Sequence, residues 1–204
     1  DAQFGELNFN YKPFTGMRSY TPKPELDKTK VEQAAELINQ AKKPFVLFGQ
    51  GVILSNAEQV FKTFIEKSGI PSACTILGLS ALETNHYLHV GLLGMHGNYA
   101  PNKLTNECDL LIAVGMRFDD RVTGNLEKYA NQAKVIHLDI DPSEIDKNVK
   151  TDVAVIADAK ESLTYLTKLV DKKEHKEWLN QFRLLEQEEQ TEVINEELNP
   201  TTHI

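Results

Sequence analysis

Short continuous apolar runs alternate along this chain with longer stretches whose apolar residues recur every three to four positions. Continuous runs are typical of strands that are buried on both faces, and the longer period is typical of amphipathic helices. Strands are expected at 45–48, 72–76, 110–114, 135–140 and 153–156. Helices are expected over 28–42, from an N-cap at Asn56 to about Gly69, over 100–107 and over 159–170. The alternation predicts an α/β fold, a Rossmann-like parallel sheet of about six strands with helices on both faces.

The two ends of the chain differ from this alternating middle. Residues 1–27 carry Pro13, Pro22 and Pro24 with no regular period, which predicts an extended arm. Residues 28–172 contain the predicted strands and their helices, and residues 173–204 form a charge-rich stretch. We therefore expect an arm or linker, a central domain over 28–172, and a solvated helix or linker over 173–204.

Composition and charge exclude several classes of protein. The net charge of −8 and the pI of about 5.3 leave no broad basic surface for nucleic acid. No apolar run approaches the roughly 20 residues that span a bilayer, and the first residues lack the features of a signal peptide. A cytoplasmic protein is expected. Cys74 and Cys108 have no CxxC spacing, which favours buried reduced thiols over a disulfide or a nucleophile.

Gly49, Gln50 and Gly51 directly follow a predicted strand, as in the first part of a dinucleotide-binding fingerprint. Glycines at this point allow backbone N–H groups to approach a phosphate closely. Leu54 stands where the third glycine belongs, and the next strand does not end in an acidic residue. The pattern is therefore weak evidence for NAD, and a turn that serves only geometry remains an alternative.

Charged residues follow several of the predicted strands. The run 110–114 ends at Gly115 and opens into Arg117, Asp119, Asp120 and Arg121, and later strands end in Asp139, Asp141 and Asp158. Ligands of open α/β sheets lie outside the carboxyl ends of the strands. Aspartates there can accept hydrogen bonds from ribose or polyol hydroxyls, and arginines can pair with phosphate. The edge suits a nucleotide cofactor, although each aspartate is as readily a helix cap, above all Asp141 before Pro142.

Two histidine-containing segments are further candidates for a site. The loop around Met95 and His96 carries three glycines, and it could lie against a flat aromatic ring or be an ordinary connection. His86 and His89 form an HxxH pattern without a third ligand at a recognised spacing. We interpret both histidines as loop residues and expect no metal site.

Four segments resemble one enzyme family, namely GQGVI at 49–53, LGMHGN at 93–98, GMRFDDRVTGN at 115–125 and HLDIDPSEIDKN at 137–148. They are similar to the large catalytic subunit of acetohydroxyacid synthase, also called acetolactate synthase. The resemblance runs through nearly the whole chain but covers only the middle third of that enzyme. It implies the central, FAD-binding domain of a thiamine diphosphate-dependent enzyme.

The resemblance also implies an activity for the intact enzyme. Members of the family join two pyruvates to form 2-acetolactate, or pyruvate and 2-oxobutyrate to form 2-aceto-2-hydroxybutyrate, in branched-chain amino-acid biosynthesis. The implied partners are a second copy of the chain, as dimer or tetramer, and a small regulatory subunit. The activating glutamate and the GDG motif that holds Mg²⁺ and thiamine diphosphate belong to the other two domains. No GDG occurs here, so we expect this chain alone to be inactive, with no catalytic residue of its own.

The same resemblance implies which residues hold FAD, mainly as a structural cofactor. They are Arg18, Gly49, Gln50, Gly51, Thr75, Ile76, Leu77, Met95, His96, Gly115, Arg117, Asp119, Arg121, Val122, Asp139, Asp158 and Ala159. Met95, Asp120 and Arg121 also match positions that border the substrate channel and herbicide site at a subunit interface.

Two alternatives to this family remain open. The chain could be a stand-alone nucleotide-binding module, for NAD, or an interaction module. It could also be the central domain of a pyruvate oxidase or glyoxylate carboligase. The proline-rich start and charged tail favour a part of a larger protein, and RFDDRVTG and GMHG argue against the other thiamine-dependent relatives.

Overall fold

Six strands form one sheet in which every hydrogen-bonded pair is parallel, so the predicted sheet is confirmed. The computed structural model describes residues 4–6, 9–11, 13 and 21–197. The strands are β1 (Pro44–Phe48), β2 (Ser72–Cys74), β3 (His89–Leu92), β4 (Leu110–Val114), β5 (Lys134–Asp139) and β6 (Val153–Ile156). Their order across the sheet is β3-β2-β1-β4-β5-β6. The chain thus builds outward from β1 on one side and returns to continue from β4 on the other.

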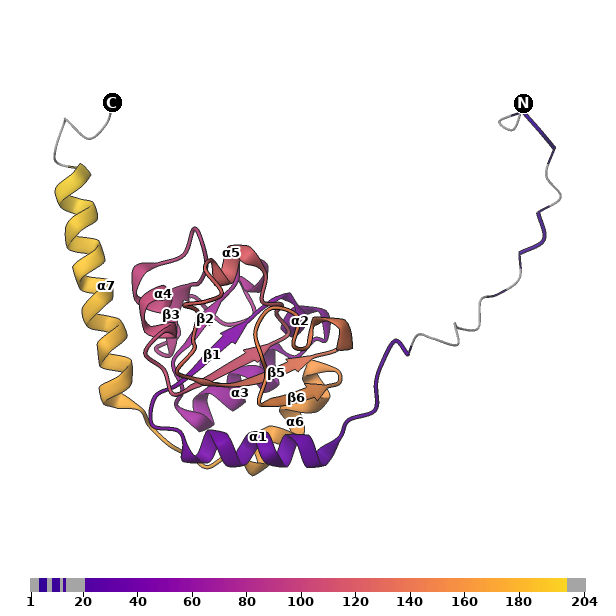
Figure 1. The fold of residues 1–204 in the computed structure, drawn as a ribbon, viewed down its shortest axis with the longest axis horizontal. Coiled ribbons are helices and arrows are strands. Elements are labelled where there is room, and N and C mark those ends of the chain that lie inside the picture. The colour runs from indigo at the N-terminus through magenta and orange to yellow at the C-terminus, as the bar shows by residue number, and fades with distance from the viewer. Residues whose placement is uncertain (1–3, 7–8, 12, 14–20, 198–204) are drawn as a thin grey trace.

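Helices lie on both faces of this sheet (Figure 1). They are α1 (Lys28–Gln40), α2 (Gln50–Leu54), α3 (Glu58–Ser68), α4 (Tyr99–Thr105), α5 (Asp120–Thr123), α6 (Ala159–Leu169) and α7 (Lys176–Glu197), with 3-10 turns η1 (Ile76–Gly78) and η2 (Pro142–Glu144). The predicted helices over 28–42, 100–107 and 159–170 correspond to α1, α4 and α6.

Two separate hydrophobic clusters occupy the two faces. One packs α1, α3 and α6 against side chains such as Phe48, Ile112 and Leu138. The other packs α4 and the first turns of α7 against Phe45, Leu111 and their neighbours. Successive side chains of a strand point to opposite faces, which is why every residue of β1 and β4 is buried although the two faces pack different helices.

The ends of α3 show one correct and one wrong prediction. Gly69 ends the helix in the left-handed conformation (φ +65°), as expected for a C-terminal glycine. The predicted cap at Asn56 is wrong, because the helix begins at Glu58 and its N-cap is Ala57, without a side-chain hydrogen bond. Asn56 has a φ of +51° and belongs to the tight connection between α2 and α3.

The charge-rich segment after residue 172 begins with a helix that is anchored in the domain. The indole Nε1 of Trp178 donates to the carbonyl oxygen of Pro44 at 2.9 Å, and the rings of Phe182 and Phe45 lie 4.9 Å apart. Both Trp178 and Phe182 are buried. The start of α7 is therefore part of the hydrophobic packing, and the predicted boundary at 172 stays a prediction.

The sequence pattern did not predict strand β3 or the short helices α2 and α5. Strand β3 includes His89, so its interpretation as a loop residue is wrong, and helix α2 begins directly after Gly49. Strand β2 ends at Cys74, earlier than expected, because η1 turns the chain.

Cys74 and Cys108 are free and buried as predicted, and burial raises the pKa of both thiols, that of Cys108 to about 12.

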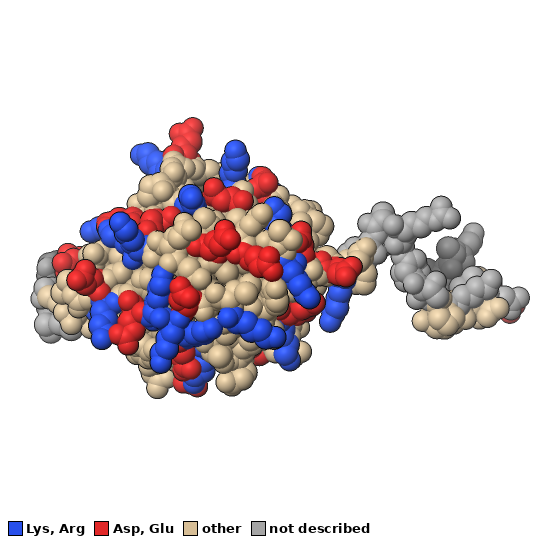
Figure 2. Space-filling model, turned by 90° about the horizontal axis from the view of Figure 1, so that it is seen from below, with Lys and Arg blue, Asp and Glu red and all other residues tan. Residues whose placement is uncertain are grey.

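The surface carries mixed charge. Lysine, arginine, aspartate and glutamate side chains are interspersed over the face seen from below in Figure 2. Within the described part of the chain, no helix combines the length and the apolar character needed to cross a membrane.

Candidate functional site

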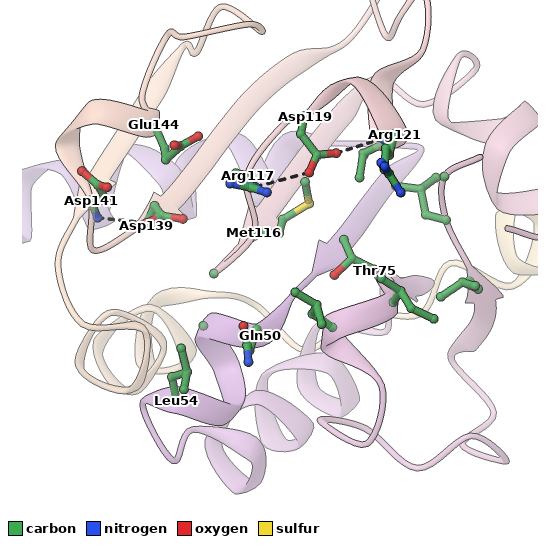
Figure 3. A pocket seen from close by; sticks show the side chains of 18 of the residues that line it. Gln50, Leu54, Thr75, Met116, Arg117, Asp119, Arg121, Asp139, Asp141 and Glu144 are labelled. Atoms are coloured by element: carbon green, nitrogen blue, oxygen red, sulfur yellow. Dashed lines mark hydrogen bonds and ion pairs between the residues drawn. The ribbon is translucent and has the colours of Figure 1, made fainter. Parts of the chain in front are cut away.

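A cavity of about 710 Å³ opens at the carboxyl ends of the central strands. Strand order reverses between β1 and β4, which pair along their whole length, and such a reversal leaves a crevice between the connections that leave in opposite directions. Residues that follow β1, β2, β3, β4 and β5 all line it (Figure 3). The topology therefore gathers segments that lie far apart in the sequence.

Glycines bring two backbones into contact at the floor of this cavity. The amide of Gly51 donates to the carbonyl of Gly115 at 2.8 Å. A Cβ at Gly51 would lie 2.5 Å from the Cα of Gly115, and one at Gly49 would lie 2.6 Å from its carbonyl oxygen. Gly115 itself has a φ of +55°, a conformation that side chains disfavour. Only glycines permit this close approach of α2 to the end of β4.

Arg117 and Arg121 supply the positive charge of the cavity. The Nε of Arg117 lies 3.3 Å from Oδ2 of Asp119, and the Arg117 side chain is 66% exposed. The other oxygen of Asp119 accepts from the amide of Val122 and caps α5. Asp119 contacts only the Nε edge, and no other interaction of Arg117 occurs among the described residues, so its terminal nitrogens can pair with a phosphate.

Carboxylates gather at a second side of the cavity, where Asp139, Asp141 and Glu144 lie together (Figure 3). Asp139 accepts from the amide of Asp141 at 2.9 Å, and Asp141 accepts from the amide of Ser143. Burial raises the pKa of Asp139, whereas the hydrogen bonds from Ser143 lower that of Asp141. Asp141 caps η2 as predicted, and the less exposed Asp139 is the acceptor best placed for a ligand hydroxyl.

A third side is more apolar. Thr75, Ile76 and Leu77 follow β2, and Met95 and His96 follow β3. Ile76, Leu77 and Met95 are exposed although they are large and apolar. A flat aromatic group could cover them.

Side-chain hydrogen bonds hold the loop that carries Met95. Asn102 of α4 accepts from the amide of Gly94 at 3.0 Å and donates to its carbonyl at 2.9 Å. The amide of Met95 donates to the carbonyl of Arg121 at 2.8 Å. The loop therefore has a defined position against α4 and α5.

The structure brings most of the predicted ligand-binding residues together in this one cavity. Those in its lining are Gln50, Gly51, Thr75, Ile76, Leu77, Met95, His96, Gly115, Arg117, Asp119, Arg121, Val122 and Asp139. Gly49 lies directly behind this lining, in contact with Gly115 and Met116.

Asp158 and Ala159 lie outside this cavity. Asp158 caps α6 through the amides of Lys160 and Glu161 and lines a shallower groove beside that helix. Ala159 is the first residue of α6 and is buried. Arg18 lies outside the described residues. A ligand contact by these three residues stays a prediction.

Several lining residues were not among those predicted to hold the ligand. They are Leu54, Leu92, Leu93, Gly94, Met116, Ile140, Asp141 and Glu144. Met116 and Ile140 directly follow predicted residues at strand ends, so the topology would have been a sufficient signal. Leu54 lies on α2, a helix that the sequence pattern did not reveal.

The donor set fits the FAD that the resemblance implies. Close-packed glycines admit a diphosphate, two arginines can offset its charge, the partly buried Asp139 can accept from hydroxyl groups, and exposed apolar side chains can cover a ring. No group of three His, Cys, Asp or Glu side chains within the described residues is arranged to hold a metal ion.

Comparison with known proteins points to the same family. A family model described as the central domain of thiamine pyrophosphate enzymes matches residues 31–166. The acetolactate synthase large subunit of Corynebacterium glutamicum is 42% identical over 166 residues, which are 81% of this chain and 26% of that protein. The probable acetolactate synthase large subunit of Methanocaldococcus jannaschii is 40% identical over 166 residues, or 80% of this chain and 28% of that protein.

A third relative extends the match. The acetolactate synthase isozyme 3 large subunit of Escherichia coli is 36% identical over 178 residues, which are 87% of this chain and 31% of that protein. The chain therefore spans between a quarter and a third of the length of these curated relatives.

Proposed function

The chain belongs to the central-domain family of thiamine pyrophosphate enzymes, and from this premise we propose that it is the FAD-binding middle domain of an acetolactate synthase large subunit. The observation that carries the proposal is the convergence of segments after five strands on one cavity at the point where strand order reverses. The curated relatives named above support the choice within the family.

Each part of the cavity has a role in this proposal. Gly49, Gly51 and Gly115 let the diphosphate approach the backbone, and Arg117 and Arg121 offset its charge. Asp139 accepts from a ribose or ribityl hydroxyl. FAD is a structural cofactor here and supplies no net redox chemistry, so the chain needs no proton donor beside the ring.

The intact enzyme that we propose joins pyruvate to a second pyruvate or to 2-oxobutyrate. Thiamine diphosphate with Mg²⁺, held by other parts of that enzyme, supplies the carbanion chemistry. We propose a homo-oligomer with a small regulatory subunit as partner and a cytoplasmic location. The 204 residues alone contribute the FAD site and should form no acetolactate.

Calorimetric titration of the 204-residue chain with FAD, and in parallel with NAD, tests this proposal. Saturable binding of FAD without a response to NAD is the expected result. Equal or tighter binding of NAD would support the alternative of a stand-alone NAD module. If the folded chain binds neither dinucleotide, the proposal that these residues hold FAD by themselves is wrong.

A further inference from the structure

Arg117 lies in a segment that has no regular secondary structure. Residues 116–119 follow the positive-φ residue Gly115 and precede α5. Met116 and Phe118 are buried, whereas the side chain of Arg117 between them points outward and contacts only the carboxylate of Asp119 among the interactions of the described residues. An exposed arginine on irregular backbone would lose much conformational freedom on binding a phosphate, unless that backbone were already fixed.

A buried histidine fixes the backbone on one side of Arg117. His137 of β5 is fully buried, and its Nε2 lies 2.8 Å from the carbonyl oxygen of Met116. Because a carbonyl can only accept, the ring carries its proton on Nε2 and donates. The ring of Phe118 meets that of His137 edge-on, with centroids 5.1 Å apart. The histidine thus contacts the residues before and after Arg117.

An asparagine fixes the other side. The Nδ2 of Asn148, between η2 and β6, donates to the carbonyl oxygen of Phe118 at 2.6 Å. The carbonyls that flank Arg117 therefore both accept from side chains of the following β5–β6 region. Neither His137 nor Asn148 lines the cavity.

We propose that His137 and Asn148 are positioning residues for the dinucleotide diphosphate, because their hydrogen bonds to the Met116 and Phe118 carbonyls hold Arg117 in its binding position. This inference rests on the proposed FAD site and adds to it two residues that do not touch the ligand. Groups that orient a binding side chain contribute by reducing the entropy that is lost on binding.

The test uses paired substitutions in the 204-residue chain. His137→Leu and Asn148→Ala remove the two donors, and His137→Gln keeps a donor near the position of Nε2. His89→Leu, which changes a buried histidine at the start of β3 away from the cavity lining, is the matched control. A change at His137 could also act through Asp139, because Nε2 of His137 lies 3.8 Å from that carboxylate. Asn148→Ala avoids this, because Asn148 donates to Phe118 and has no hydrogen bond to Asp139.

FAD affinity is expected to fall by about three- to tenfold in His137→Leu and Asn148→Ala, the range that one net hydrogen bond provides. His137→Gln and His89→Leu should stay within about twofold of wild type. In an Arg117→Ala background the first two substitutions should change the affinity by less than about twofold, because the side chain that they position is gone.

Amide hydrogen exchange provides a second readout that needs no ligand. Exchange across residues 115–119 should be faster in His137→Leu and Asn148→Ala than in wild type, with the remainder of the sheet unchanged. Unchanged affinity and exchange in both folded variants would overturn the proposal, and so would equal losses of affinity with and without Arg117. If wild type fails to bind FAD, the proposal that these residues hold FAD by themselves is wrong, and exchange alone decides whether the two residues fix the segment.

Discussion

Arg117 is the side chain on which most of the proposed diphosphate recognition depends. Its terminal nitrogens are free of Asp119, and its backbone is tied to β5 and to the segment before β6. Glycines and strand-end aspartates shape the cavity, but a forked cation is the group that matches a phosphate. Substitution at this one residue is therefore the most direct test of the site.

Arg117→Ala should weaken FAD binding by about 1.5–3 kcal/mol, the range for hydrogen bonds to charged groups, with the fold retained. Calorimetric titration gives the affinity, and thermal unfolding checks the fold. Lys103→Ala removes a cation on α4 outside the cavity lining and should leave the affinity unchanged. An Arg117→Ala variant that binds as well as wild type would remove this arginine from the site.

Asp139 should make the stability of the protein depend on pH. Burial raises the pKa of its carboxyl above the ordinary value of 3.8, so the folded state retains the proton to a higher pH than the unfolded state. The protonated carboxyl therefore stabilises the folded state fully below pH 3.8, and this contribution is lost as the pH rises through the pKa of the folded state. Asp139→Asn should therefore raise the free energy of unfolding at pH 7 and have little effect at pH 3.5. Urea unfolding at the two pH values measures both, and a less stable variant at pH 7 would contradict the assignment.

Asp141→Asn provides the control of opposite sign. Hydrogen bonds from Ser143 lower the pKa of Asp141, so its contribution is present above the ordinary pKa and is lost as pH falls through the folded value. The substitution should reduce stability at neutral pH. Asp139→Asn should also weaken FAD binding, because it removes a charged acceptor.

At the scale of elements, the buried strands were the most predictable part of the fold. The apolar runs at 110–114 and 153–156 match β4 and β6 residue for residue, because every residue of these strands is buried or partly buried and none is polar. Strand β3 was missed because His89 and Gly91 interrupt its four residues at the sheet edge. Helix α2 was missed because it has five residues and begins among glycines.

The site shows a similar division. Residues at strand ends, such as Arg117 and Asp139, could be predicted because topology alone places them at one edge. His137 and Asn148 could not, since their partners are backbone carbonyls, and a pattern of side chains carries no information about which carbonyls need a donor. A buried histidine inside an apolar strand is nevertheless a signal that a polar partner must exist nearby.

The crossing of α2 over the end of β4 gives a prediction for glycine. Gly51→Ala places a Cβ 2.5 Å from the Cα of Gly115, which is a backbone atom and not the end of a flexible side chain. Although alanine favours helices, we expect a loss of about 1–3 kcal/mol of stability, as for other overpacked sites. Denaturant unfolding measures it.

Gly124→Ala is the control for Gly51→Ala, because it tests backbone strain at a glycine where an added Cβ would meet no other atom. Gly124 has a φ of +57° and nothing within 4 Å of its Cβ position. It should cost roughly 1–2 kcal/mol of backbone strain while leaving FAD binding intact. If Gly51→Ala proves neutral, the two backbones must separate more easily than the structure indicates.

At the scale of the whole molecule, the two ends of the parallel strands differ in what they contact. The carboxyl edge carries the cavity, while the amino end of β1 receives the indole of Trp178 through the carbonyl of Pro44. From there α7 runs along α4, where Glu189 accepts from the amide of Tyr99. The start of α7 therefore completes the second hydrophobic face, and none of its residues lines the cavity.

A comparison of shortened chains tests where the domain ends. A chain of residues 1–172 follows the boundary predicted from sequence, and a chain of residues 1–189 keeps Trp178, Phe182 and Glu189. Loss of a buried Trp or Phe side chain typically costs about 3–5 kcal/mol, so the shorter chain should be less stable by at least about 3 kcal/mol. The longer one should match the full chain, as followed by circular dichroism during urea unfolding.

Trp178→Ala in the full chain shows how much stability is lost with the Trp178 side chain alone, without shortening the chain. It removes the indole and its hydrogen bond to Pro44 while leaving the helix in place, and should reproduce most of the loss. Because the anchor lies at the edge opposite the cavity, the folded fraction of each variant should bind FAD with unchanged affinity. Equal stability of the chains ending at 172 and 189 would instead place the boundary at 172 and make the burial of Trp178 and Phe182 energetically unimportant.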